Sequence, residues 1–76
     1  MTSIPKPGDR IRLLAMHDDP DPIQMGSVGT VVRVDRHGGG REVWHQIDVD
    51  WDNGRRLMLV SPPDQFAIVG TSDDGV

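Results

Sequence analysis

The chain has 76 residues, no cysteine, 36% hydrophobic residues and a net charge of −4, from eight Lys and Arg against twelve Asp and Glu. So short a chain is expected to form one domain, and hollowing its small core for an active-site cavity would remove the burial that stabilises it. The lack of cysteine excludes disulfides and thiolate metal sites, and the negative charge argues against non-specific nucleic-acid binding. Function is therefore expected at the surface.

The sequence carries no apolar segment of the kind that targets or spans a membrane. Residues 1–10 lack the apolar region of a signal peptide, and no window approaches 18 apolar residues. The expected location is therefore cytoplasmic.

Short runs of alternating or β-branched residues are separated by Gly and Pro. These runs predict five strands, at 9–14, 29–35, 43–51, 55–60 and 66–69. The clearest is 43–51, where Ile47, Val49 and Trp51 alternate with polar residues, so Trp51 is expected in the core. Phe66, which opens the last strand, is also expected in the core. Arg33 interrupts the alternation of the second strand, which a β-bulge or a change of sheet would explain.

The connections have equally distinct compositions. Pro7 and Gly8 predict a turn before the first strand, and three consecutive glycines in 36–42 predict a mobile loop. The sequence Asp-Asn-Gly at 52–54 predicts a tight hairpin with a primed turn, because Asn and Gly tolerate positive φ. Residues 61–66 predict a short 3-10 turn.

No window of 12 residues shows helical periodicity, so the predicted fold class is all-β. Five short strands in about 60 residues predict a small five-stranded SH3-like barrel with a short 3-10 turn before the last strand. The predicted barrel domain covers 8–69, between an N-terminal arm at 1–7 and a flexible acidic tail at 70–76.

Several segments resemble known families. "GDRIRLL…GSVGTVVRVD" looks like the opening of SH3-like and KOW-type barrels. More closely, "GDRIRLLAMHDDPDPIQMGSVGTVVRVD", "QIDVDWDNGRRLMLV" and "DQF" resemble small bacterial and phage proteins known as the DUF4314 type, over roughly residues 5–69. This resemblance implies the fold and the domain limits, and it brings no established activity.

The loop after the first strand, "HDDPDPIQM", carries His17 and a group of three aspartates. A hard-cation site needs about six oxygens and a closing Glu, which this loop lacks, and Pro20 and Pro22 fix backbone directions unsuited to wrapping an ion. Catalysis by paired carboxylates needs a cleft that a solvated loop does not provide. Gly26 and Gly29 are followed by neither a Lys-Ser/Thr pair nor a helix, so they do not predict a phosphate site. We therefore expect no metal, no cofactor and no enzymatic activity.

Two surfaces remain as binding hypotheses. The first is protein–protein recognition by a face between Met16–Met25 and Arg36–His45, where acidic side chains beside an exposed aromatic ring would suit a basic or proline-rich peptide. The residues expected to contact the partner are Met16, Asp18, Asp19, Asp21, Met25 and Trp44. The chain has no Tyr to line such a groove, so the likeness to SH3 grooves is geometric. The alternative reading is that Trp44 packs as core or lid and that the aspartates only solubilise the chain.

The second hypothesis is association with nucleic acid or the ribosome, as KOW-like barrels do through basic loops. The residues that would carry it are Arg33, Arg36, Arg41, Arg55 and Arg56. Self-association through an open sheet edge is a third possibility that the sequence leaves open.

Overall fold

The computed structural model describes residues 4–16 and 19–71, and in these residues it contains strands and no helix. The strands are β1 (Asp9–Ala15), β2 (Val28–His37), β3 (Trp44–Trp51), β4 (Leu59–Ser61) and β5 (Gln65–Thr71). All pairings are antiparallel, and they join the strands into one sheet in the order β4-β3-β2-β1-β5. The predicted all-β class with five strands is confirmed.

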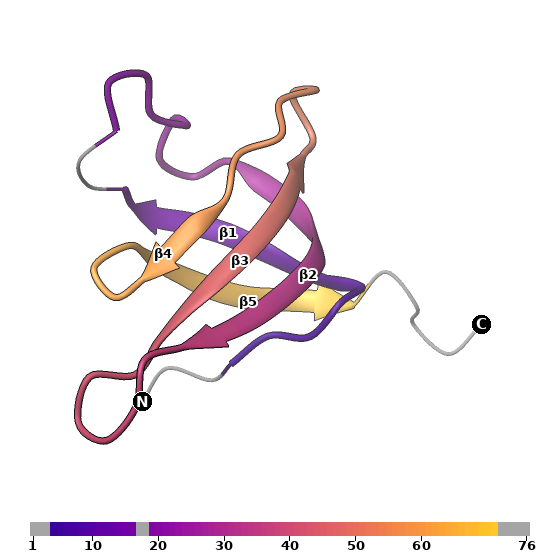
Figure 1. Ribbon diagram of the computed structural model, residues 1–76. Coiled ribbons are helices and arrows are strands. Elements are labelled where there is room, and N and C mark those ends of the chain that lie inside the picture. Colours follow the sequence, from indigo (N-terminus) through magenta and orange to yellow (C-terminus); the bar gives the residue numbers. More distant parts are fainter. Residues whose placement is uncertain (1–3, 17–18, 72–76) are drawn as a thin grey trace.

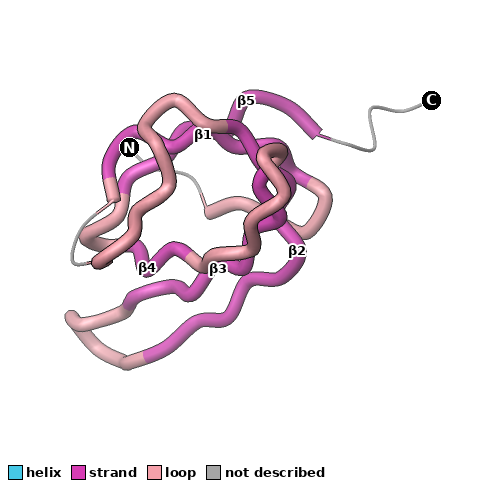
Figure 2. Tube along the Cα trace, turned by 90° about the horizontal axis from the view of Figure 1, so that it is seen from above, coloured by secondary structure: helices cyan, strands magenta, loops and turns pink. Residues whose placement is uncertain are grey.

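The sheet is strongly curled. In Figure 1, β3 and β4 pass across β1 and β5, and Figure 2 shows the strands following one another around a common centre. Within the described ranges no pairing joins β4 to β5, so the hydrogen-bonded sheet is open at that point. The SH3-like assignment stays a prediction. The arm and the acidic tail fall partly outside the description, at residues 1–3 and 72–76.

The hydrophobic core lies inside the curl. Its buried members are Ile11, Leu13, Ile23, Val31, Ile47, Val49, Trp51, Leu59 and Phe66. The alternation in β3 predicted the burial of Ile47, Val49 and Trp51, and Phe66 is buried as expected. The indole Nε1 of Trp51 also donates a hydrogen bond to the Leu57 carbonyl at 3.0 Å, which satisfies the polar atom of a buried ring.

The turn expected before β1 is present. Gly8 has φ +96°, the Asp9 amide donates to the Lys6 carbonyl at 3.0 Å, and the buried Asp9 carboxylate accepts a hydrogen bond from the Lys6 amide. A proline followed by a positive-φ glycine is typical of a type II turn. The Gly8 amide donates to the Val31 carbonyl at 2.8 Å, which attaches the turn to β2.

The interruption at Arg33 is a β-bulge in β2. Val31 lies opposite Val49 and Arg33 lies opposite Asp48, so Val32 is the extra residue on the β2 side. The bulge places both Val32 and Arg33 on the exposed side of the strand.

Gly29 is required by close approach between β2 and β3. A Cβ atom on Gly29 would lie 2.6 Å from Val49 Cγ1 and 2.8 Å from the Asp50 carbonyl oxygen. This glycine therefore has a packing role at the start of β2.

Two of the predicted turns differ in the structure. Residues 62–64 form a turn with cis peptide bonds at Ser61-Pro62 and Pro62-Pro63, and they do not form a 3-10 helix. The reason is that the two prolines have no amide hydrogen, and the amide of Asp64 donates to the Val60 carbonyl, four residues back.

A hairpin joins β3 to the segment 55–61, which runs back along β3 and is called the return segment below. Its loop has three residues, 52–54, and is not the predicted two-residue primed turn. The Gly54 amide donates to the Trp51 carbonyl, and the Trp51 amide donates to the Arg55 carbonyl, both at 2.9 Å. Only Gly54, with φ +92°, is needed for this loop type. The return strand is also shorter than predicted, because regular pairing is confined to Leu59–Ser61 and an isolated bridge between Asp50 and Arg56.

Candidate functional site

The loop between β1 and β2 is held at the end of the molecule that carries the 52–54 hairpin (Figure 1). Ile23 is 2% exposed and joins the core, and its amide contacts Met16 Sδ at 3.4 Å. Asp21 pairs with Arg55 at 3.4 Å, and Arg55 Nη2 also donates to the Asp21 carbonyl at 3.0 Å. The side chain of Asp19 accepts a hydrogen bond from the Asp21 amide at 2.8 Å. Two of the predicted aspartates are therefore used in local contacts.

The two methionines predicted to contact a partner differ in their exposure to solvent. Met16 is half-buried against the core, and Met25 is 71% exposed. Asp18, like His17, lies outside the described residues. In residues 4–16 and 19–71, no three His, Cys, Asp or Glu side chains come together in a way that would hold a metal ion.

Trp44 lies at the opposite end of β3, beside the glycine-rich hairpin between β2 and β3 (Figure 1). Trp44 pairs with His37 across the strands, and their rings stack with centroids 4.3 Å apart at an interplanar angle of 19°. The indole is half-buried and stands outside the core cluster. His37 Nε2 is buried without a hydrogen-bond partner in the described part of the chain.

The glycine-rich segment expected to be a mobile loop closes as a turn. Gly38 and Gly40 have positive φ, and the Glu42 amide donates to the Gly39 carbonyl at 3.1 Å. Gly38 is also required by space, because a Cβ atom there would lie 2.1 Å from the Glu42 carbonyl oxygen. The backbone beside Trp44 is therefore held in a hydrogen-bonded turn.

The structure does not bring the two predicted binding loops together. Figure 1 shows the 19–27 segment and the 38–43 hairpin at opposite ends of the molecule. The 62–64 turn separates Trp44 from the β1 end of the acidic loop, since Gln65 pairs with Ala15 while Pro62 lies near Trp44. The face predicted between Met16–Met25 and Arg36–His45 is therefore not one continuous surface, because β2 carries its two flanking loops at opposite ends.

A hollow of about 580 Å³ opens beside Trp44. Its apolar wall consists of Val43, Trp44, Val60 and Pro62. Gly38 and Gly39 leave its floor without side chains, and Arg41 and Glu42 provide charges at its rim. This composition, an aromatic ring with apolar neighbours and a polar rim, is typical of a binding surface.

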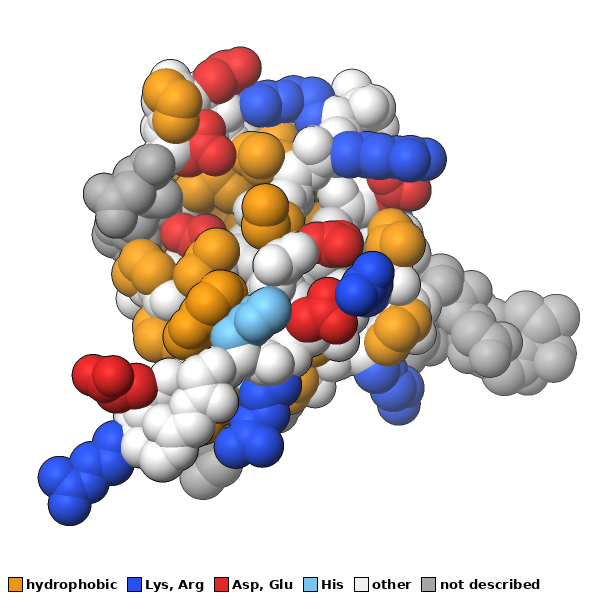
Figure 3. Space-filling view, in the orientation of Figure 1, with side chains coloured by type: hydrophobic (Ala, Val, Ile, Leu, Met, Phe, Trp, Pro, Cys, Tyr) orange, Lys and Arg blue, Asp and Glu red, His pale blue; other side chains and the backbone are white. Residues whose placement is uncertain are grey.

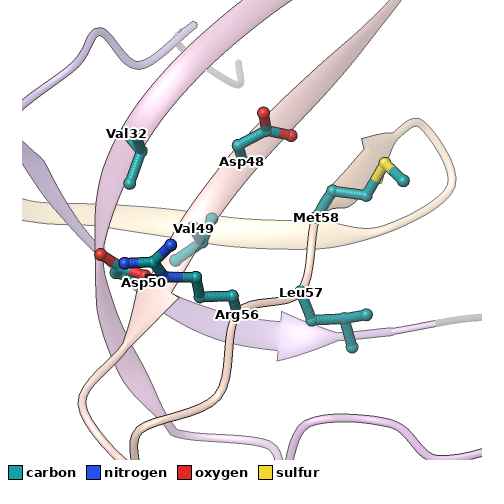
Figure 4. Close-up of a pocket in the computed structure, with 7 residues that line it drawn as sticks. All are labelled: Val32, Asp48, Val49, Asp50, Arg56, Leu57 and Met58. Atoms are coloured by element: carbon teal, nitrogen blue, oxygen red, sulfur yellow. Dashed lines mark ion pairs between the residues drawn. The ribbon is translucent and has the colours of Figure 1, made fainter.

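A second hollow, of about 350 Å³, lies farther along the same side of the sheet. Figure 4 shows its lining: Val32, Asp48, Val49, Asp50, Arg56, Leu57 and Met58. The bulge in β2 brings Val32 to this hollow, where its side chain is 54% exposed, and Met58 opposite is 49% exposed. Asp50 pairs with Arg56 at 2.7 Å.

The two hollows are parts of one surface, which we call the outer β3 face. Alternate β3 residues point out of the core: Trp44, Gln46, Asp48 and Asp50. Val60 lies opposite Gln46 and Arg56 lies opposite Asp50, in one register that places Met58 beside Asp48. Figure 3 shows hydrophobic and acidic side chains on the side where β3 and β4 lie, with His and Lys or Arg side chains next to the acidic ones.

Sequence reasoning placed Trp44 with its neighbouring loop and missed this face. The signal was present, because Trp44 shares its parity with Gln46, Asp48 and Asp50, and a strand presents alternate residues on one side. The contribution of Pro62, Val60 and Met58 could not be found in this way, since it depends on how the return segment pairs with β3.

The five arginines proposed for nucleic-acid binding are distributed over both ends of the molecule. Three of them have carboxylate partners, with Arg33 at 2.8 Å from Asp35 and the pairs of Arg55 and Arg56 as above. Arg36 and Arg41 are exposed near the glycine-rich hairpin. Neighbouring carboxylates reduce the positive potential that phosphate binding requires.

One ion pair with two hydrogen bonds, between Arg10 and Asp52, lies away from both hollows and has a structural role. The guanidinium of Arg10 contacts both carboxylate oxygens of Asp52, at 2.7 and 2.5 Å, and also donates to Thr30 Oγ1 at 2.9 Å. These hydrogen bonds to Arg10 lower the pKa of Asp52 below its ordinary value. The pair joins β1 to the 52–54 hairpin across the sheet.

Residues 4–16 and 19–71 include no helix long and apolar enough to cross a membrane. The fold and the outer β3 face thus define a small all-β domain with an open, partly apolar surface. The chain belongs to the family described as a domain of unknown function, DUF4314, whose model matches residues 4–69. No curated protein and no solved structure matches it.

Proposed function

We propose that this protein is a non-enzymatic binding module that recognises another protein, with the hollow beside Trp44 as its principal contact surface. The observation that carries the proposal is the position of Trp44, which is half-buried, stacked on His37 and outside the core, and which lines an open, partly apolar hollow. The face differs from the one predicted from the sequence, but Trp44 is common to both.

The chemistry of the hollow favours an extended peptide segment over a small molecule. The hollow is open, and Trp44, Val60 and Pro62 offer apolar contact with few converging polar groups. Aromatic-lined grooves of this type bind proline-containing segments, whose extended conformation costs little entropy on binding. Of the partners predicted from the sequence, a basic or a proline-rich segment, these contacts favour the proline-rich one.

Nucleic acid is a weaker candidate because no group of free arginines forms one surface among the described residues. Of the five proposed arginines, Arg36 and Arg41 have no carboxylate partner among the described residues, and Arg41 lines the Trp44 hollow, where it can equally form the rim of a peptide site. The cytoplasmic location stays a prediction.

The proposal is tested by selecting binders from a phage library of random ten-residue peptides with the immobilised full chain. We expect enrichment of peptides that contain proline or an aromatic residue, with no enrichment by Trp44→Ala. As a control, Met25→Ala removes a more exposed apolar side chain on the far loop and is expected to enrich the same peptides. No enrichment by the wild type, or equal enrichment by Trp44→Ala, would overturn the proposal.

Nucleic-acid binding is tested in parallel by anisotropy with labelled single-stranded RNA and duplex DNA at rising salt. Binding that falls steeply with salt and survives Trp44→Ala would favour the arginines over the hollow. We expect no such binding at physiological salt.

A further inference from the structure

We infer that the second hollow, around Asp48, is a specificity site for one lysine or arginine of the partner, four residues away from the residue that the partner places against Trp44. This inference rests on the proposed function, and it names the chemistry and spacing that the partner must have. Recognition of a positively charged residue is thereby assigned to the outer β3 face, whereas the sequence alone suggested the acidic loop at 17–21.

The first argument is that Asp48, unlike the carboxylates near it, has no ion-pair partner among the described residues. Asp48 accepts a hydrogen bond from Gln46 Nε2 at 3.2 Å, and it has no cationic partner in the described part of the chain. Arg33 is opposite Asp48 in the β2–β3 register, but its Nε is 2.8 Å from Asp35. Asp48 is thus a partly buried negative charge, available to a cation from outside.

The second argument is the shape and chemistry of the walls. Val32 and Met58, both exposed, lie on either side of Asp48 (Figure 4), while the one cation that lines this hollow, Arg56, is paired with Asp50. Lysine and arginine have the matching form, with an aliphatic stem that packs on apolar walls and a charged end that reaches a carboxylate. A neutral apolar side chain would contact the walls but would leave Asp48 desolvated without a partner.

The third argument is continuity with the Trp44 hollow. Trp44 and Asp48 are four residues apart on the same side of β3, about 13 Å at roughly 3.3 Å per residue. Between them lie Gln46 and Val60, which face each other across β3 and β4. A peptide segment in the β conformation has the same repeat and presents alternate side chains on one side, so its residues i and i+4 reach both hollows at once.

The inference is tested with the peptides recovered by the wild-type chain in the selection above. We expect them to carry Lys or Arg four residues from a proline or aromatic residue, on either side. Replacing that basic residue with Gln, or changing the protein by Asp48→Asn, should weaken binding about tenfold, as for loss of a charged hydrogen bond in a partly desolvated site. The amide introduced by Asp48→Asn retains an oxygen that can accept from Gln46, so the fold is expected to persist.

The matched control is Asp21→Asn, which changes the net charge by the same amount on the acidic loop. We expect it to change affinity less than twofold, whereas a loss equal to that of Asp48→Asn would assign the effect to net charge and overturn the inference. Asp48→Lys should in turn prefer the peptide in which the basic residue is replaced by Glu. Peptides that depend on Trp44 but carry no basic residue, or that bind Asp48→Asn unchanged, would overturn this inference and leave the proposed function standing. No recovery at all would overturn both.

Discussion

The two tryptophans of the chain should respond in opposite ways to truncation. Trp51 is 3% exposed and donates its indole hydrogen to Leu57, whereas Trp44 is half-buried and contacts His37 at the edge of a hollow. Replacing each with alanine therefore separates a residue that stabilises the fold from one that is available for binding.

The expected magnitudes follow from these environments. Trp51→Ala removes a fully packed ring from the core, for which a loss of about 3–5 kcal/mol is typical. Total stability of a domain is on the order of 5–15 kcal/mol, and a 76-residue chain lies at the lower end. Trp51→Ala should therefore be largely unfolded or nearly so at 37 °C.

Trp44→Ala loses mainly the stacked pair, worth about 0.5–1.5 kcal/mol. In a domain of this size a loss of 1 kcal/mol lowers Tm by roughly 4–8 °C. This variant should remain folded.

The assay is urea and thermal unfolding followed by far-UV circular dichroism on both variants and the wild type. Trp51→Phe keeps an aromatic ring in the core and provides a milder variant if Trp51→Ala does not fold. A loss of stability in Trp44→Ala as large as in Trp51→Ala would refute the reasoning, because it would make Trp44 part of the core and remove it as a binding surface.

Three further changes test the packing and electrostatics. Gly29→Ala should lower Tm strongly in a thermal scan, because its Cβ atom would meet the β3 backbone. The control is Gly70→Ala, whose Cβ atom would meet nothing within 4 Å and which should change Tm by at most a few degrees. Ile23→Ala should cost about 2–5 kcal/mol in urea unfolding, as for a core residue, while Met25→Ala nearby should be nearly neutral. The folded-state pKa of Asp52 is lowered, so its stabilising effect is present above the ordinary pKa of about 4 and is lost as the pH falls. The Tm difference between wild type and Asp52→Asn should accordingly shrink below pH 4, and a difference that grows there would contradict the assigned ion pair.

Much of the fold could be predicted from local patterns. The alternation of Ile47, Val49 and Trp51 defines the buried side of β3, and Pro7-Gly8 defines the turn before β1. The DUF4314-type resemblance is confirmed by the family match over residues 4–69. These features depend on residues close together in the sequence, where period and turn chemistry are informative.

The burial of Ile23 could not be predicted in this way. It is a single apolar residue between Pro22 and Gln24 in an acidic loop, with no periodicity to show which way it points. Its burial depends on the curl of the sheet, which brings the loop back over the core.

The candidate site was only partly predictable for the same reason. Trp44 was identified by its type and its position near the glycine-rich loop, but its neighbours Val60 and Pro62 come from a segment 16 to 18 residues later. The acidic loop was expected beside Trp44, and the structure places it at the other end of β2 (Figure 1). Only the pairing of β2, β3 and β4 determines which side chains share a surface.

The most direct test of the binding account is a titration of the ¹⁵N-labelled protein with a peptide recovered in the selection, followed by two-dimensional NMR. The account predicts the largest amide and indole shifts on the outer β3 face, at Trp44, Gln46, Asp48, Met58 and Val60, with little change elsewhere. Shifts confined to the 19–25 loop and the 52–56 hairpin, with Trp44 and Asp48 unmoved, would contradict it.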